Sequence, residues 1–271
     1  MDNYSIALIG EGMIELQEIR SGEIKQTFGG DTFNTAVYLS RLDTGRSLHI
    51  DYVTALGFDL FSTKMINFLE KEKIGSSMIQ QVKGGQPGLY HIQLDEDGER
   101  IFHYWRSEAP IRHCFEYPGS DEILNRLEDY DAVYLSGITL AILLPKSREC
   151  LLDRLVELHS KGKTIYCDLN YRSHLWQSKK EARQIYNRLI PLCHTLLLNI
   201  EEGSSLIGFE TIGEIHQALH NRGVCESVIR AGGNPCSVCS NGSIDEIAAV
   251  DVPGIVDTTT AGDSFSAAYL F

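Results

Sequence analysis

The chain has 271 residues, and its 37 acidic side chains outnumber its 24 basic ones, giving a net charge of −13 at pH 7. This balance argues against a nucleic-acid or anionic-membrane partner, because such partners are bound through clustered lysines and arginines. With 43% hydrophobic and 23% charged residues, the composition is that of a globular protein and not of a disordered chain.

Short apolar runs alternate along the chain with segments of helical period. The runs are rich in β-branched or aromatic residues, and they cover residues 4–10, 51–56, 132–137, 164–168, 195–199 and 227–230. Within 59–73, apolar residues recur at i, i+4, i+7 and i+8, which predicts a helix. Strands alternating with helices predict an α/β fold with a doubly wound, mostly parallel sheet. Ligands of such sheets bind beyond the carboxyl ends of the strands, so we look there first for functional residues.

Two stretches, 11–28 and 87–106, break this alternation and predict antiparallel strand pairs. In the second, the acidic-glycine turn 95–98 is a hairpin signal. Strand alternation places Tyr90 and Ile92 on one face and His91 on the other. A small sheet of this kind, lying over the strand ends of the large one, would make a lid.

The seven cysteines are an odd number scattered along the chain, which indicates a reducing compartment and no disulfide framework. Cys236 and Cys239 form a C-x-x-C pair, but in a strand they would point to opposite faces, which does not favour a metal or redox role. The first residues lack the basic region of a signal peptide, and the longest uncharged run, 133–144, is shorter than the ~20 residues of a membrane span. We therefore expect a cytoplasmic protein.

Residues 257–265, Asp-Thr-Thr-Thr-Ala-Gly-Asp-Ser-Phe, lead into a predicted helix over 264–270. The free N–H groups at the start of such a helix attract a phosphate or a developing negative charge. Asp263 beside them fits a general base that takes a proton from an attacking hydroxyl. It fits equally well an N-terminal helix cap, and the residues alone leave both interpretations open.

A second cluster, Gly29-Gly30-Asp31-Thr32-Phe33-Asn34, lies between the first strand pair and a helix. Glycines let the backbone approach a ligand closely, and the Asp and Asn side chains suit sugar hydroxyls. A plain turn with a capping Asp is the alternative. The phosphate loop G-x-x-x-x-G-K-[ST] is absent from the sequence, and the dinucleotide motif after Gly10 and Gly12 fails at Glu15.

The two clusters together resemble the two signatures of the ribokinase (PfkB) family of sugar kinases. Five further segments are similar to the subfamily that phosphorylates 2-keto-3-deoxygluconate: 9–16, 88–92, 98–106, 134–138 and 170–172. The resemblance runs over the whole chain as one unit, 1–271. It implies a ribokinase-like fold with a β lid, ATP and Mg²⁺ as cofactors, and phosphorylation of the sugar acid at its 6-hydroxyl.

The resemblance also assigns roles to residues. It makes Asp263 the catalytic base and gives the backbone N–H groups of Ala261, Gly262 and Asp263 to the anion hole. It assigns the sugar to Gly30, Asp31, Asn34, Tyr90, Tyr104, Arg106, Asn170 and Arg172. It assigns the nucleotide to Asn199, Arg230, Gly232, Gly233, Thr260, Ala261 and Gly262, with Glu202 acting on Mg²⁺ through water. A guanidinium fork suits the carboxylate of a sugar acid, whereas the alternative for Arg106 and Arg172 is surface solubility.

Three departures from the family pattern bear on these expectations. Thr260 replaces a common glycine, and a β-branched residue would make a left-handed backbone costly there. Pro235 removes one N–H donor from the nucleotide side. The sequence stops at Phe271, soon after Asp263, where the family continues for some tens of residues, so we expect weak ATP binding with the sugar site formed. Another sugar kinase of the family, or an inactive sugar-acid-binding remnant, remains the alternative, and a homodimer through the lid is expected.

Overall fold

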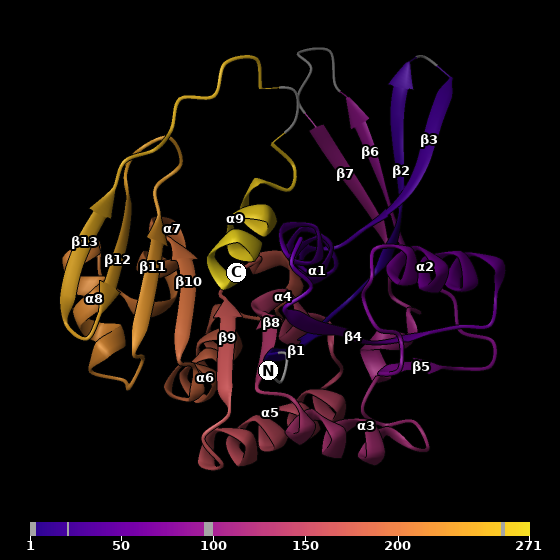
Figure 1. Ribbon diagram of the computed structural model, residues 1–271, viewed down its shortest axis with the longest axis horizontal. Helices are drawn as coiled ribbons and strands as arrows, with labels where there is room; N and C mark the ends of the chain where they lie inside the picture. The colour runs from indigo at the N-terminus through magenta and orange to yellow at the C-terminus, as the bar shows by residue number, and fades with distance from the viewer. Residues whose placement is uncertain (1–3, 21, 95–99, 256–257) are drawn as a thin grey trace.

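A nine-stranded sheet forms the centre of the structure, in the order β13-β12-β11-β10-β9-β8-β1-β4-β5 (Figure 1). The structure is a computed structural model that describes residues 4–20, 22–94, 100–255 and 258–271. The turn expected at 95–98 and the first residue of the late motif, Asp257, lie outside the described residues. The strands of this sheet are β1 (Tyr4–Ile9), β4 (Leu48–Leu56), β5 (Ile79–Gln81), β8 (Ala132–Ser136), β9 (Thr164–Asp168), β10 (Thr195–Asn199), β11 (Glu226–Arg230), β12 (Cys236–Ser240) and β13 (Ser243–Ile247).

The sheet is parallel from β11 to β5, and β12 and β13 close one edge as antiparallel strands. This confirms the predicted mostly parallel sheet and the six predicted strands. β4 begins at Leu48, before the predicted start of its strand, because Leu48 already pairs with Tyr4 of β1. On β12, Cys236 is half-buried and Cys239 is buried, as expected for positions on opposite faces.

Helices cover both faces of the large sheet. One face carries α1 (Asp31–Leu42), α2 (Leu60–Lys71) and α9 (Ala261–Leu270), and the other carries α3 (Ser120–Arg126), α4 (Gly137–Ile142), α5 (Pro145–Ser160), α6 (Lys179–Leu189) and α8 (Ile212–His220). A short α7 (Ile200–Glu202) follows β10 and continues into a π turn, η5 (Gly203–Ile207); 3₁₀ turns lie at η1 (Pro110–His113), η2 (Leu127–Asp129), η3 (Ser173–Leu175) and η4 (Ile190–Leu192). β1 shows the alternation that this requires: Ile6 and Leu8 join the core under α1, whereas Ala7 and Ile9 join the opposite core.

The predicted helix within 59–73 is α2, and it begins where Asp59 accepts hydrogen bonds from the backbone N–H groups of Phe61 (2.8 Å) and Ser62 (3.2 Å). Met65 and Leu69 of its expected apolar face are fully buried, whereas Phe61 in the first turn is exposed. α9 confirms the helix expected after the late motif and lies beside α1 (Figure 1). In the part of the chain that the structure describes, there is no helix long and apolar enough to cross a membrane.

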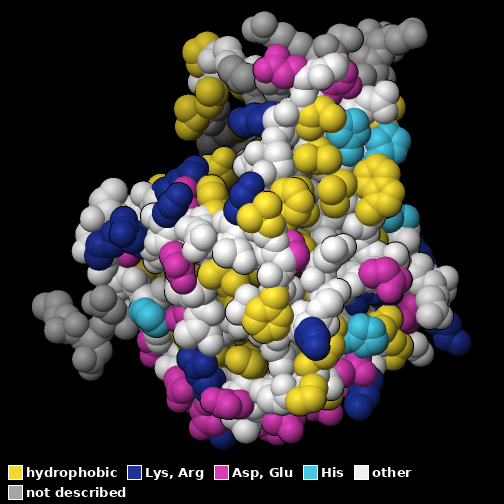
Figure 2. Space-filling view, turned by 90° about the vertical axis from the view of Figure 1, so that its right-hand side faces the viewer, with side chains coloured by type: hydrophobic (Ala, Val, Ile, Leu, Met, Phe, Trp, Pro, Cys, Tyr) yellow, Lys and Arg dark blue, Asp and Glu magenta, His cyan; other side chains and the backbone are white. Residues whose placement is uncertain are grey.

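A separate four-stranded sheet stands at one end of the large one, in the order β3-β2-β6-β7 (Figure 1). Its strands are β2 (Met13–Arg20), β3 (Glu23–Gly29), β6 (Gly88–Leu94) and β7 (Arg100–Trp105). The two predicted antiparallel pairs are present, and β2 joins them by pairing in parallel with β6, which the sequence did not indicate. Figure 2 faces this end of the molecule, where apolar and histidine side chains gather on the outer surface.

The two faces of the small sheet differ as predicted. Tyr90 and Ile92 are buried in a small core with Met13, on the side of the large sheet. His91 lies on the other face, where its ring stacks on that of His103 across the strand pair at 6.3 Å. The inner face therefore carries the residues that can reach a ligand held at the strand ends.

Candidate active site

Two hollows meet at the carboxyl ends of the parallel strands. The first, of about 960 Å³, lies between the small sheet and the start of α1. The second, of about 880 Å³, lies between the ends of β9 to β11, the edge strands and the start of α9. They share Asn170, Arg172, Thr259 and Asp263. A group bound in one hollow can therefore contact a group bound in the other beside Asp263.

The residues that the sequence assigned to a sugar come together in the first hollow. Its lining includes Gly30, Asp31, Asn34, Tyr90, Tyr104, Arg106, Asn170 and Arg172. They come from α1, from the inner face of the small sheet and from the loop after β9, so only the folded chain brings them together.

Gly30 occupies a position that only glycine can take. It precedes α1 with φ 137° and ψ 147°, and an added Cβ would collide with the backbone carbonyl oxygen of Glu11. The close approach that the sequence suggested is thus made to Glu11, at the point where the chain enters the small sheet.

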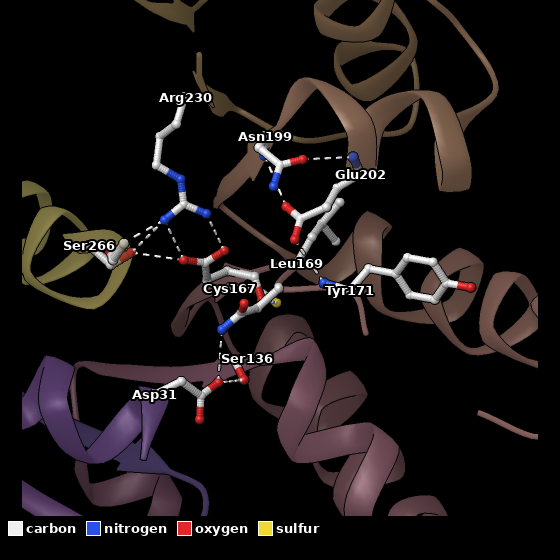
Figure 3. A network of polar contacts seen from close by, with 12 residues as sticks. Asp31, Ser136, Cys167, Leu169, Tyr171, Asn199, Glu202, Arg230 and Ser266 are labelled. Carbon is white, nitrogen blue, oxygen red and sulfur yellow. Dashed lines mark hydrogen bonds and ion pairs between the residues drawn. The ribbon is translucent and has the colours of Figure 1, made fainter. Parts of the chain in front are cut away.

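Asp31 and Asn34 project from the first turn of α1 into the first hollow. One carboxylate oxygen of Asp31 accepts hydrogen bonds from the hydroxyl of Ser136 and, at 3.1 Å, from the side-chain amide of Asn170 (Figure 3). The side-chain amide of Asn34 donates to the carboxylate of Asp263 at 2.8 Å. The other carboxylate oxygen of Asp31 is left to face the hollow (Figure 3).

Arg106 follows β7 and is held by a partner that the sequence did not indicate. Its guanidinium pairs with the carboxylate of Glu11, and the two side chains are 12% and 3% exposed. The guanidinium also lies over the ring of Tyr104, 5.7 Å from its centroid. The Nε–H of Arg106 is buried without a hydrogen-bond partner among the described residues.

Arg172 lies where the two hollows join. It is 46% exposed, its nearest acidic neighbour is Glu202 at 3.7 Å, and it donates to the backbone carbonyl of Tyr171 at 3.2 Å. Its charge is thus more open to a ligand than that of Arg106.

Asp263 is the third residue of α9 and faces both hollows. Burial raises the pKa of its carboxyl well above the usual value, and the charges of Asp31 and Asp168 act in the same direction. The hydrogen bond from Asn34 and the charge of Arg230 oppose this rise in pKa. A carboxylate with a raised pKa is a stronger proton acceptor than an ordinary aspartate.

The first turn of α9 presents backbone N–H groups to the second hollow. The first intrahelical bond runs from Ser264 to the carbonyl of Thr260, so the N–H groups of Gly262 and Asp263 have no intrahelical acceptor. The Ala261 N–H, assigned with them to an anion hole, donates instead to the carbonyl of Thr258 at 3.1 Å. Thr260 has φ −107°, so the backbone strain expected from a left-handed conformation at this threonine is not present.

The residues assigned to a nucleotide are only partly gathered in the second hollow. Asn199, Glu202, Arg230, Gly232, Ala261 and Gly262 line it. Gly233 and Thr260 are not among the described residues that line it. Arg230 is also less free than expected, because its guanidinium is engaged by Asp168 at 2.8 and 2.7 Å.

Glu202 forms a capping box with Asn199, which is the ordinary helix-start role of such a pair (Figure 3). Its two carboxylate oxygens accept from the N–H groups of Tyr171 (2.8 Å) and Asn199 (2.9 Å). Burial raises the pKa of Glu202 to about 7, with the charge of Asp168 acting in the same direction. Within the described ranges, no group of three or more His, Cys, Asp or Glu side chains could hold a metal ion. These residues fit Mg²⁺ only if the ion is carried by phosphates and reaches Glu202 through water.

The sequence reasoning missed several residues of the site. Asp168 ends β9 and Ser136 ends β8, so both stood at strand ends where ligands are expected. Glu11 follows β1 in the same way, and it lay within a segment already compared with the subfamily. The strand-end signal was available for all three, but it does not say which polar residues turn toward each other.

Comparison with known proteins finds relatives that match nearly the whole chain. The pfkB family of carbohydrate kinases matches residues 3–271. A 2-dehydro-3-deoxygluconokinase of Escherichia coli K12 is 42% identical over 269 residues, which are 98% of this chain and 86% of that protein. The structure of 2-dehydro-3-deoxygluconokinase from Thermotoga maritima superposes with a TM-score of 0.87 at 23% identity, covering 99% of this chain and 85% of that one. A fructokinase from Xylella fastidiosa with bound ATP superposes at 0.80 and 20% identity, over 97% and 79% of the two chains.

Proposed function

The chain belongs to the pfkB family of carbohydrate kinases, and we propose that it phosphorylates 2-dehydro-3-deoxy-D-gluconate (2-keto-3-deoxygluconate) at the 6-hydroxyl, with ATP as donor. The observation that carries this proposal is that the two hollows meet at Asp263. A sugar in the first hollow and a triphosphate in the second would bring hydroxyl and γ-phosphorus together beside that carboxylate.

The sugar acid would be recognised by charge and by hydrogen bonds. The carboxylate of the substrate suits the guanidinium groups of Arg106 and Arg172, which lie on the lining of the first hollow. Its hydroxyls suit the amide groups of Asn34 and Asn170 and the carboxylate oxygen of Asp31 that accepts no hydrogen bond from the described residues. Tyr90 and Tyr104, on the inner face of the small sheet, would cover the sugar from above, and the sheet would then act as a lid that excludes water.

The chemistry would be an in-line transfer. The 6-hydroxyl loses its proton to the Asp263 carboxylate, its oxygen forms a bond to the γ-phosphorus, and the bond from that phosphorus to the bridging oxygen breaks to release ADP. The N–H groups of Gly262 and Asp263 would stabilise the charge on the transferred group. Asn34 holds the carboxylate of Asp263 in place at 2.8 Å.

ATP would occupy the second hollow, with its phosphates toward the start of α9. Mg²⁺ supplies charge neutralisation when it arrives with the phosphates, and Glu202 would contact it through water. The chain's own contribution there is the pair of free N–H groups and the nearby Arg230.

A substrate panel with two arginine variants tests the proposal. We expect the unmodified chain to phosphorylate 2-dehydro-3-deoxygluconate in preference to fructose and ribose. Arg172→Met and Arg106→Met should weaken sugar-acid binding by about 1.5–3 kcal/mol, the range for hydrogen bonds to charged groups, and leave binding of an uncharged ketose nearly unchanged. Equal losses for both sugars in calorimetric titrations would refute the carboxylate role, and preference for fructose or ribose would refute the substrate.

We also propose that residues 1–271 form a single kinase domain and that the protein is cytoplasmic. We further propose that two copies form a homodimer through the small sheet. All seven cysteines have free thiols, which suits a reducing compartment. The outer face of the small sheet exposes Ile101 and Trp105, which a second copy could cover. Sedimentation of the chain with Trp105→Arg tests the pairing: the variant should be monomeric at concentrations where the parent is a dimer.

A further inference from the structure

Asp168, at the end of β9, binds two groups from distant parts of the chain. Its carboxylate accepts from both terminal nitrogens of Arg230, at 2.7 and 2.8 Å, and from the hydroxyl of Ser266 at 2.9 Å (Figure 3). Arg230 ends β11, and Ser266 lies in the second turn of α9. The exposed fractions of the Asp168 and Arg230 side chains are 4% and 17%, so the contact is nearly closed to water.

Arg230 also contacts the first turn of α9. One terminal nitrogen of Arg230 donates to the backbone carbonyl of Gly262 at 3.3 Å. It also lies 3.3 Å from where a Cβ on Gly262 would sit, so the guanidinium packs directly on the backbone of that turn. Arg230 thereby touches the turn whose N–H groups face the second hollow.

Within α9 itself, the hydroxyl of Ser264 donates to the carbonyl of Ala261 at 3.1 Å, but the start of the helix lacks a side-chain cap among the described residues. Thr260 stands at the N-cap position, and its side chain makes no capping hydrogen bond to the described residues. A side-chain cap would occupy the N–H groups of the first turn, which would then be lost to a ligand. Holding the turn from outside, through its carbonyl and through Ser266, leaves those N–H groups available.

We propose that Asp168 is a positioning residue for phosphoryl transfer, which through Arg230 and Ser266 fixes the first turn of α9 and with it Asp263. The proposal rests on the function proposed above. Asp168 fixes the plane of the guanidinium by accepting a hydrogen bond from each of its terminal nitrogens, and the guanidinium in turn positions the carbonyl of Gly262. Asp168 needs no contact with the reacting atoms.

The pair also acts on Asp263 by charge, with opposite signs. Asp168 raises the pKa of Asp263, and Arg230 lowers it. The other polar groups that line a hollow with Asp263 or interact with its charge include Asp31, Asn34, Tyr90, Tyr134 and Arg172. Both variants keep all of these side chains, so the two members of the pair can be tested against the same set of neighbours.

Kinetics of Asp168→Asn and Arg230→Gln test the proposal. Both variants should lower kcat at least tenfold and leave the KM for the sugar acid within about twofold. The acidic limb of kcat/KM should move to lower pH in Asp168→Asn and to higher pH in Arg230→Gln. If the pair only stabilises the fold, the acidic limb should stay in place in both variants. That result, or a shift of the acidic limb in the same direction in both variants, would overturn the proposal.

Two further variants serve as controls. Glu181→Gln removes the charge from a similar pair, in which Arg148 binds Glu181 at 2.9 Å and the carbonyl of Leu143 at 3.1 Å, remote from both hollows. It should lower stability without moving the pH profile. Ser266→Ala keeps both charges and loses one hydrogen bond to Asp168, so it should lower kcat modestly with an unchanged pH profile.

Hydrogen exchange separates this proposal from the proposed function. Backbone amides of 260–266 should exchange at least tenfold faster in Asp168→Asn than in the parent, and not in Glu181→Gln. This difference in exchange is expected even if the unmodified chain does not phosphorylate the sugar acid. Such a lack of activity would reject the proposed substrate but not the positioning role of Asp168. Unchanged exchange in α9 of Asp168→Asn would overturn the positioning role.

Discussion

Glu11 pairs with Arg106 at the base of the small sheet, where the chain enters and leaves it. Glu11 lies between β1 and β2, and Arg106 follows β7. The backbone carbonyl of Glu11 abuts Gly30 after β3, and its carboxylate abuts Gly88 at the start of β6. All four passages of the chain between the two sheets therefore meet at this one glutamate.

The first prediction concerns the charge of Glu11. Glu11→Gln leaves the buried guanidinium of Arg106 without a counter-ion, which should lower the free energy of unfolding by about 3 kcal/mol. The carboxylate of the sugar acid can replace that counter-ion. Saturating sugar acid should therefore raise the Tm of the variant more than that of the parent, whereas an uncharged ketose should raise both equally. Equal shifts with the sugar acid would show that the ligand carboxylate does not reach Arg106.

The second prediction concerns Asp263, for which the alternative of an N-terminal helix cap is wrong, because Thr260 stands at the N-cap of α9. If it is the base, Asp263→Asn should lower kcat by about 10²–10⁴ and change the sugar affinity little. Asp59→Asn is the matched control, because Asp59 only caps a helix that is remote from Asp263 in the sequence. Steady-state kinetics on the two variants decide the question: a near-normal kcat for Asp263→Asn would show that Asp263 is not the base.

The third prediction concerns Gly30. Gly30→Ala forces a side chain into a backbone conformation with positive φ and against the carbonyl of Glu11, so we expect a loss of at least about 2 kcal/mol in unfolding by urea. Gly45→Ala is the control, since nothing described lies within 4 Å of its Cβ. It should change the stability by less than about 0.5 kcal/mol. A tolerated alanine at position 30 would contradict the tight junction described here.

The fourth prediction concerns His216, which is fully buried between the hydroxyls of Ser227 (2.6 Å) and Ser237 (2.9 Å). Burial lowers the pKa of His216 to about 4 from its usual 6.5. The unfolded chain therefore binds a proton at this residue more readily than the folded chain does. Its contribution to stability is present above pH 6.5 and is lost as the pH falls toward 4, by about 3 kcal/mol.

His216→Gln should remove this part of the pH dependence. Urea unfolding of the parent and the variant between pH 7 and pH 4 measures the difference, with the exposed His159→Gln as control. Parallel stability curves for the parent and His216→Gln would mean that His216 does not resist protonation in the folded chain.

Much of the fold follows from local sequence patterns. The parallel strands were predicted because each is a short apolar run between helical segments, and burial on both faces requires that pattern. The antiparallel edge formed by β12 and β13 was not predicted, because β13 is exposed along its whole length and carries no apolar run. The parallel pairing of β2 with β6 joins residues 75 positions apart, such as Glu15 and Tyr90, and no local pattern encodes it.

The candidate site divides in the same way. Motifs predicted which residues gather around Asp263, because the strand ends and the start of α9 place them there. The partners of the arginines could not be predicted: Arg106 and Glu11 lie 95 positions apart, and Arg230 and Asp168 lie 62 apart. Charge alone does not say which of several buried carboxylates an arginine will meet. The concern about Thr260 arose from an assumed backbone conformation that the chain does not adopt.

The four passages of chain between the two sheets also bear on the order of folding. The small sheet is built from two strand pairs, β2–β3 and β6–β7, which are separated in the chain by α1, β4, α2 and β5. Pairing β2 with β6 therefore closes a long loop at an entropic cost. Once β1, β4 and β5 are assembled, the passages already lie close together and most of that cost has been met. The small sheet should therefore form after the adjoining edge of the large sheet during refolding. It should also open before that edge in the native state, so that its backbone amides lose protection from hydrogen exchange without unfolding of the rest.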